Sequence, residues 1–138
     1  MVNPTNIATT GAASQSTELG AYSASRAVDG NLDNFTATTN QADSWWRVEF
    51  PQPISIGQVV LWNRVNCCPE RLSNFRVSVL DSNGLNEIWG ENFFTPVQGS
   101  GNPAEGASFT IDVPPGTVGD LIQVQILGLN NAGNGYLS

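Results

Sequence analysis

Apolar and polar residues alternate with a period of two in several segments of this chain. In residues 107–113, for example, Phe109, Ile111 and Val113 are apolar and the side chains between them are polar. Successive side chains of a β-strand point to opposite faces, so this pattern predicts strands with one buried face. The expected strands are 45–50, 54–64, 74–80, 86–94, 107–113 and 121–127. No segment shows the 3.6-residue period of an amphipathic helix.

Turn-forming residues separate the expected strands. Pro51-Gln52-Pro53 is expected to end one strand, and Asp81-Ser82-Asn83-Gly84 is expected to join two strands in a tight turn. The first 44 residues are polar and irregular, with a strong turn at Asp29-Gly30-Asn31. The length suits one domain of roughly 100–150 residues. We therefore expect an all-β fold over residues 1–138, a single antiparallel β-sandwich of the jelly-roll kind.

Composition excludes several classes of function. The chain has no His and no Lys, which removes Ser-His-Asp catalysis, His-based zinc sites and Schiff-base chemistry. Its net charge of −7 makes nucleic acid and anionic membranes poor partners. No apolar run approaches the roughly 18 residues of a membrane-spanning helix. Met1 does not begin a signal peptide, so a secreted protein would have its targeting segment outside this sequence.

The segment from Trp62 to Arg71 is the richest in candidate chemistry. Its two cysteines, Cys67 and Cys68, are adjacent and are the only ones in the chain. Consecutive Cα atoms lie about 3.8 Å apart, below the usual disulfide span of about 4.4 Å or more, so a bond between them would close a strained eight-membered ring. Two free thiols and a stiff vicinal disulfide are both open from the residues alone.

Arg64 and Arg71 flank the cysteine pair and are two of only five arginines. A guanidinium offers a planar fork of hydrogen-bond donors, which suits adjacent sugar hydroxyls or a carboxylate. The alternative is that each arginine pairs with one of the twelve carboxylates on the surface, an interaction of little energetic value. Their position around the cysteine pair favours a binding role.

These motifs resemble an F-type lectin, the fucose-binding branch of the discoidin-like, galactose-binding-domain superfamily. The resemblance covers nearly the whole chain, although the family continues into a last strand where this sequence stops at Ser138. The matching stretches are Asn6-Ile7-Ala8, Ser14-Gln15-Ser16, 24–31 (Ala-Ser-Arg-Ala-Val-Asp-Gly-Asn), 45–48 (Trp-Trp-Arg-Val), 63–71 and 135–138.

The resemblance implies a shallow sugar pocket between loops at one end of a jelly-roll sandwich. The two sugar-binding arginines of the family fall on Arg64 and Arg71. Its vicinal disulfide, whose face packs on the sugar, falls on Cys67 and Cys68. The apolar wall for the fucose methyl group falls on Phe35 and Leu19.

Two positions depart from the family pattern. The family's His falls on Ala37, and Thr38 or Asn40 are candidates to replace it. The Asp of the cysteine motif is Asn66 here. Losing one polar anchor costs about 1–3 kcal/mol, which is roughly tenfold to a hundredfold in affinity.

The resemblance also implies a structural Ca²⁺ at the Asp29 turn. The carbonyl of Arg26 and the oxygens of Asp29 and Asn31 would contribute to the six to eight ligands that this cation needs. The alternative is a plain turn in which Asp29 accepts a hydrogen bond from its own backbone. Trp45 and Trp46 are expected to point to opposite faces of a strand, one of them into the core, and not to form a sugar platform.

The sequence therefore predicts a secreted, non-catalytic lectin that binds a terminal fucose-like or galactose-like sugar. The alternatives are a discoidin-type adhesion domain that binds protein, or the accessory module of a larger carbohydrate-active enzyme. An enzyme is not expected, because no pair of carboxylates falls in a recognisable motif. An unpaired strand edge would also allow an oligomer.

Overall fold

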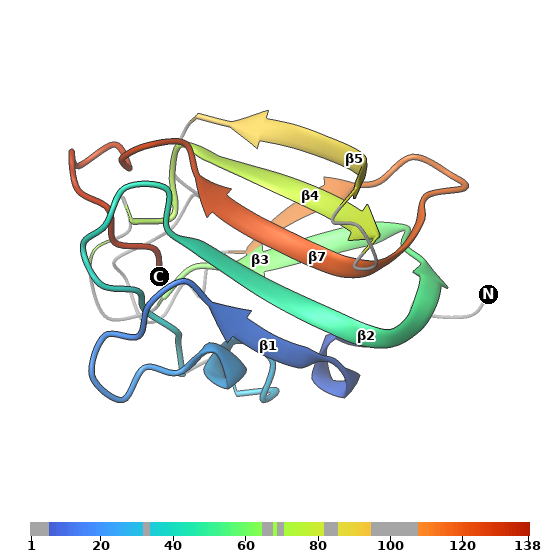
Figure 1. The fold of residues 1–138 in the computed structure, drawn as a ribbon, viewed down its shortest axis with the longest axis horizontal. Helices are drawn as coiled ribbons and strands as arrows, with labels where there is room; N and C mark the ends of the chain where they lie inside the picture. The colour runs from blue at the N-terminus through green and yellow to red at the C-terminus, as the bar shows by residue number, and fades with distance from the viewer. Residues whose placement is uncertain (1–5, 32–33, 65–67, 69–70, 82–85, 95–107) are drawn as a thin grey trace.

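Two antiparallel sheets form the architecture of this computed structural model, which describes residues 6–31, 34–64, 68, 71–81, 86–94 and 108–138 (Figure 1). In the described part of the chain, one sheet has five strands in the order β1-β2-β7-β4-β5 and the other pairs β3 with β6. The strands are β1 (Ala12–Gln15), β2 (Trp45–Ser55), β3 (Gln58–Trp62), β4 (Phe75–Asp81), β5 (Asn86–Phe93), β6 (Ser108–Asp112) and β7 (Val118–Ile126). Two short 3₁₀ helices, η1 (Ala8–Thr10) and η2 (Ala24–Ala27), are the described helices, and neither is long enough to cross a membrane.

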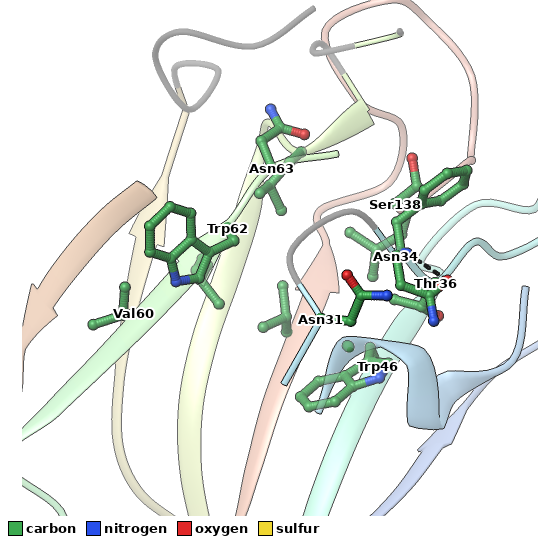
Figure 2. A pocket seen from close by; sticks show the side chains of 14 residues that line it. Asn31, Asn34, Thr36, Trp46, Val60, Trp62, Asn63 and Ser138 are labelled. Carbon is green, nitrogen blue, oxygen red and sulfur yellow. Dashed lines mark hydrogen bonds between the residues drawn. The ribbon is translucent and has the colours of Figure 1, made fainter. Parts of the chain in front are cut away.

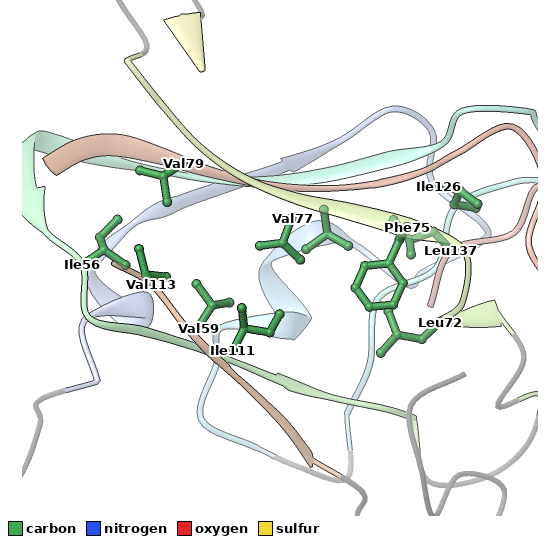
Figure 3. Close-up of a cluster of buried hydrophobic side chains, with 11 residues drawn as sticks. Ile56, Val59, Leu72, Phe75, Val77, Val79, Ile111, Val113, Ile126 and Leu137 are labelled. Carbon is green, nitrogen blue, oxygen red and sulfur yellow. The ribbon is translucent and has the colours of Figure 1, made fainter. Parts of the chain in front are cut away.

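The hydrophobic core lies between the two sheets, as the alternation predicts (Figure 3). On β4, Phe75, Val77 and Val79 are fully buried and face the second sheet, where Val59 and Ile111 complete the cluster. The polar residues between them point away from the core. The expected all-β class, an antiparallel β-sandwich, is therefore confirmed.

Strand β2 differs from the prediction because it continues through both prolines. Its pairing with β7 is interrupted between Glu49 and Ile54. Proline has no N–H to donate, so the strand stays extended there but loses its ladder of hydrogen bonds. The expected strand over 54–64 is also wrong as one unit, since Ile54 and Ser55 end β2 and β3 begins only at Gln58.

Strand β1 was not expected from the sequence. It holds four residues, Ala-Ala-Ser-Gln, which are too few and too polar for a visible alternation, and it pairs with the start of β2. The predicted turn at 81–84 falls largely outside the described residues, but β4 and β5 do pair as neighbours, with Asp81 opposite Asn86.

The adjacent tryptophans at the start of β2 point to opposite faces, as predicted. Trp46 packs against the core, and its Nε1–H donates to the carbonyl of Ala24 at 3.0 Å. Trp45 lies on the outer face, where the guanidinium of Arg47 sits 4.1 Å from its ring centroid. Both rings therefore have structural partners.

One end of the sandwich gathers the loops that carry the predicted site. The starts of β2 and β4 and the ends of β5 and β7 lie there, because Phe75 is opposite both Phe93 and Ile126 and Trp45 is opposite Gln125. The C-terminus returns to the same end, at the left of Figure 1.

Candidate functional site

Arg64 lies two residues beyond the end of β3 and is 9% exposed. Its guanidinium carbon is 3.8 Å from the centroid of the Phe35 ring, and its Nη1 lies 3.5 Å from Oγ of Ser138. Burial, and then the positive charge of Arg71, lowers the pKa of Arg64 below its ordinary value, while Tyr22 acts in the opposite direction. An arginine remains charged under such conditions, so the site holds a cation that is largely withdrawn from water.

Arg71 has a matching arrangement on a second aromatic ring. Its guanidinium carbon is 4.1 Å from the centroid of Tyr136, and its backbone N–H donates to the carbonyl of Cys68 at 3.1 Å. Tyr136 is itself held in place, because Nδ2 of Asn130 donates to its carbonyl at 2.9 Å. Stacking occupies the face of a guanidinium and leaves its N–H donors at the edge, where a ligand can meet them.

Phe35 has both faces of its ring in contact with neighbours. The ring of Tyr22 stacks on it at 4.5 Å between centroids and 19° between planes. Since the guanidinium of Arg64 lies over the ring as well, the two neighbours must occupy opposite faces to avoid each other. Phe35 therefore presents its edge, and its assignment to the wall around a sugar methyl group stays a prediction.

Ala37 and Leu19 hold two loops together beside this stack. Ala37 is fully buried; its N–H donates to the carbonyl of Tyr22 at 3.2 Å, and its carbonyl accepts from the N–H of Leu19 at 3.0 Å. A buried alanine exposes no side-chain atom to a ligand. Leu19 is half-buried.

The two candidates to replace the family's His are engaged in other contacts. Thr38 is 1% exposed, and its Oγ1 accepts from the N–H of Leu137 at 2.9 Å. Oδ1 of Asn40 accepts from the N–H of Gly135 at 2.6 Å. Both side chains tie the last residues of the chain to the loop after Phe35.

Asn66 and Cys67 lie outside the described residues. Cys68 is half-buried, takes a positive φ of 61° and is not a free thiol. The structure thus brings Arg64, Arg71, Phe35 and the backbone of Cys68 into one neighbourhood, with Leu19 and Ala37 beside it.

The side chain of Asp29 accepts hydrogen bonds from groups in its own turn and just after it. Oδ1 of Asp29 accepts from the N–H of Asn31 at 2.8 Å, and Oδ2 accepts from Nδ2 of Asn34 at 2.5 Å. These hydrogen bonds, first that from Asn31 and then that from Asn34, lower the pKa of Asp29, which keeps its carboxylate ionised. No cluster of three acidic, His or Cys side chains occurs among the described residues.

The donor chemistry of this turn nevertheless fits a hard cation. An exposed carboxylate and an amide oxygen stand within three residues of each other, and the carbonyl of Arg26 completes the predicted set.

A groove that the sequence did not predict opens beside the site, between β3 and the η2 region (Figure 2). Its volume is about 140 Å³. It is lined mainly by apolar side chains, together with several amide and hydroxyl groups. Val60 and Trp62 on β3 are about half exposed, and Ser138 lies near Asn34 and Thr36 in Figure 2. The only sequence signal was the presence of bulky apolar residues at outward positions of β3.

The sequence was compared with models of known protein families. Residues 26–124 match the family model of the NedA-like, galactose-binding domain. The chain belongs to this family. The match includes Arg26, the Asp29 turn, Arg64 and Arg71, and it ends within β7.

The curated proteins that resemble this chain include fucolectins. Fucolectin-6 of Anguilla japonica is 40% identical over 92 residues, which cover 59% of this chain and 50% of that protein. The domain therefore spans about half the length of this curated relative.

Two solved structures resemble the domain over most of its length. The lectin domain of Lectinolysin, complexed with Lewis B antigen, is 27% identical with a TM-score of 0.79, and the match covers 99% of this chain and 92% of that one. A fucose binding module of Streptococcus pneumoniae is 32% identical with a TM-score of 0.72, and the match covers 89% and 84%.

Proposed function

We propose that this domain is a non-catalytic lectin that binds a terminal fucose-like or galactose-like sugar at the end of the sandwich. The observation that carries the proposal is the pair of guanidiniums, Arg64 and Arg71, each lying on an aromatic ring and close enough that one lowers the pKa of the other. The names of the relatives, fucolectin and fucose binding module, support fucose as the sugar.

A neutral sugar suits this pair of cations. Its hydroxyl and ring oxygens accept hydrogen bonds from the guanidinium edges without adding a charge that must be buried. Hydrogen bonds to a charged partner are worth about 1.5–3 kcal/mol each, roughly twice the value of neutral ones. The partial burial of Arg64 strengthens such bonds, because less water competes for its donors.

The loop between the two arginines supplies the rest of the proposed site. We infer a disulfide between Cys67 and Cys68, since Cys68 is not a free thiol and Cys67 is the only other cysteine. Its polarizable surface would pack on the sugar ring, and Asn66 would orient an arginine. Intact mass should rise by about two units on reduction, and the appearance of two titratable thiols in the oxidised protein would contradict the bond.

A structural Ca²⁺ at the Asp29 turn is a further proposal. Arg26, Asp29 and Asn31 would supply its carbonyl, carboxylate and amide oxygens. The ion would add rigidity to the turn and no catalytic chemistry. A disulfide and a calcium site both suit an extracellular protein, so we propose that the domain is secreted and meets glycans outside the cell.

The decisive experiment is a glycan array followed by calorimetric titration with L-fucose. Arg64→Lys and Arg71→Lys keep the positive charge but remove the fork, so each should weaken binding about tenfold or more. Arg47→Lys is the matched control, because Arg47 also lies on an aromatic ring but on the outer face of the larger sheet. Wild-type protein that binds no fucoside or galactoside would refute the lectin and favour the adhesion domain. If both arginine variants bind the sugar as tightly as wild type, the sugar binds at another part of the domain.

A further inference from the structure

We propose that Arg26 and Tyr22 are positioning residues for Arg64, acting through a series of side-chain contacts that passes through Phe35. The inference rests on the proposed function, in which Arg64 contacts the sugar. It concerns residues that need not touch the ligand.

The stack contains Tyr22, Phe35 and Arg64, and the guanidinium of Arg26 lies over the Tyr22 ring. The guanidinium carbon of Arg26 lies 5.5 Å from the centroid of Tyr22, the two rings stack at 4.5 Å, and Arg64 lies 3.8 Å from the centroid of Phe35. Phe35 has Tyr22 on one face and Arg64 on the other. A shift of its ring toward one of them would therefore loosen its contact with the other. The position of Arg64 therefore depends on the position of Tyr22.

The Asp29 turn fixes the far end of the stack. Nη1 of Arg26 donates to Oδ1 of Asn34 at 2.9 Å, and Nδ2 of the same asparagine donates to Asp29 at 2.5 Å. Asn34 is thus oriented by a carboxylate on one side and a guanidinium on the other. Since Asn34 directly precedes Phe35, the turn also fixes the backbone position from which the Phe35 side chain extends.

Backbone hydrogen bonds fix the two rings relative to each other. The carbonyl of Tyr22 accepts from the N–H of Ala37 at 3.2 Å and from Nε2 of Gln15 at 3.0 Å. Phe35 lies only two residues before Ala37 in the sequence. The hydrogen bond between Ala37 and Tyr22 therefore holds together the backbone segments that carry the two rings.

A pre-ordered arginine binds with a smaller entropic cost. Arginine has one of the largest rotamer entropies among side chains, and freezing it on ligand binding subtracts from the affinity. A stack that freezes Arg64 in the free protein removes part of that cost. Substitutions at Arg26 or Tyr22 should therefore weaken binding even though these residues do not contact the ligand.

The test uses two readouts, one of which needs no ligand. In NMR spectra of the free protein, ring currents of Phe35 should displace the side-chain signals of Arg64. Tyr22→Leu and Arg26→Gln should move these signals toward random-coil values, with the larger change for Tyr22→Leu. Affinity for L-fucose in calorimetry should fall about two- to tenfold for Tyr22→Leu, in keeping with the value of an aromatic pair. Tyr22→Phe keeps the ring and should behave as wild type.

Arg47→Gln is the matched control, because it removes an arginine–aromatic contact from the outer face of the sheet and should change neither readout. Unchanged Arg64 signals in a folded Tyr22→Leu protein would overturn the inference. If that variant does not fold, Arg26→Gln decides in the same way, since Arg26 lies outside the core. A wild type that ignores L-fucose but shows Arg64 signals sensitive to Tyr22 would refute the proposed function and support the positioning. Wild-type protein that binds L-fucose, with Arg64 signals that do not respond to Tyr22→Leu, would support the proposed function and refute the positioning role.

Discussion

Thr38 and Leu137 hold each other through two hydrogen bonds although 99 positions separate them in the sequence. The N–H of Thr38 donates to the carbonyl of Leu137 at 3.0 Å, and the N–H of Leu137 donates to Oγ1 of Thr38 at 2.9 Å. This pair fastens the last residues of the chain to the loop that contains Phe35 and Ala37. Tyr136, on which Arg71 lies, is placed by the same attachment.

Gly135→Ala should destabilise the domain. A Cβ at Gly135 would lie less than 3.0 Å from backbone atoms of Gln41, which cannot move aside as a flexible side chain does. We expect a loss of about 1–3 kcal/mol in the free energy of unfolding, measured by urea titration. Gly57→Ala is the control, since nothing lies within 4 Å of its added Cβ. Equal stability of the two variants would contradict the close packing.

Ala37→His should lower stability and should not increase affinity for fucose. Ala37 is fully buried, so an imidazole there must displace its neighbours. Overpacking of this kind costs about 1–3 kcal/mol. The measurements are a thermal melt and calorimetry with L-fucose. A folded variant that binds fucose more tightly would show that the loop can turn residue 37 toward the ligand.

Glu87 should make a small contribution to stability that disappears in acid. The pKa of Glu87 lies below its ordinary value, mainly because its carboxylate accepts a hydrogen bond from Arg76. Burial acts in the opposite direction, and a hydrogen bond from Ser78 lowers the pKa further. The stabilisation is therefore complete above the ordinary carboxyl pKa and is lost as the pH falls through the lowered, folded-state pKa. Both partners of this ion pair are more than a third exposed, so the effect should be modest and should weaken further in high salt.

The check compares the urea midpoints of wild type and Glu87→Gln from about pH 7 to about pH 3, where the difference should shrink toward zero. Gly90→Ala should imitate the substitution, because its Cβ would lie less than 3.0 Å from both Glu87 and Arg76 and would push the pair apart. A difference that grows in acid would reverse the assigned direction.

Calcium should raise the melting temperature if the Asp29 turn binds it, because a ligand of the folded state alone stabilises that state. We expect the melting temperature to fall when a strong chelator is added to protein with Ca²⁺ and to recover when Ca²⁺ is restored. Asp29→Asn should remove the response. An unchanged melting curve with chelator would leave the turn as the hydrogen-bonded structure described above.

The sequence predicted the elements whose side chains alternate. β4, β6 and β7 are half-buried strands with long apolar faces, and such strands are visible in the order of residues alone. β1 was missed because four small and polar residues carry no periodicity, and its place depends on pairing with β2. The prolines of β2 were misjudged because they interrupt hydrogen bonding without ending the extended backbone.

The candidate site was predictable as a set of residues but not as a geometry. Arg64 and Arg71 were recognisable from the motif, whereas their aromatic platforms were not, because Phe35 and Tyr136 stand far from them in the chain. The burial of Ala37 and the use of Thr38 to hold Leu137 likewise follow from tertiary contacts that no local pattern reports.

The second sheet has one consequence for the order in which the domain opens. Within the described residues β3 and β6 pair only with each other, so both are edge strands, whereas β2, β4 and β7 each have two neighbours. Backbone amides of β3 and β6 should exchange their hydrogens for deuterium well before those of β7, through partial opening that leaves the larger sheet intact. Arg64 lies two residues beyond the end of β3, so partial opening of this sheet should disturb the position of Arg64 while the larger sheet is still intact.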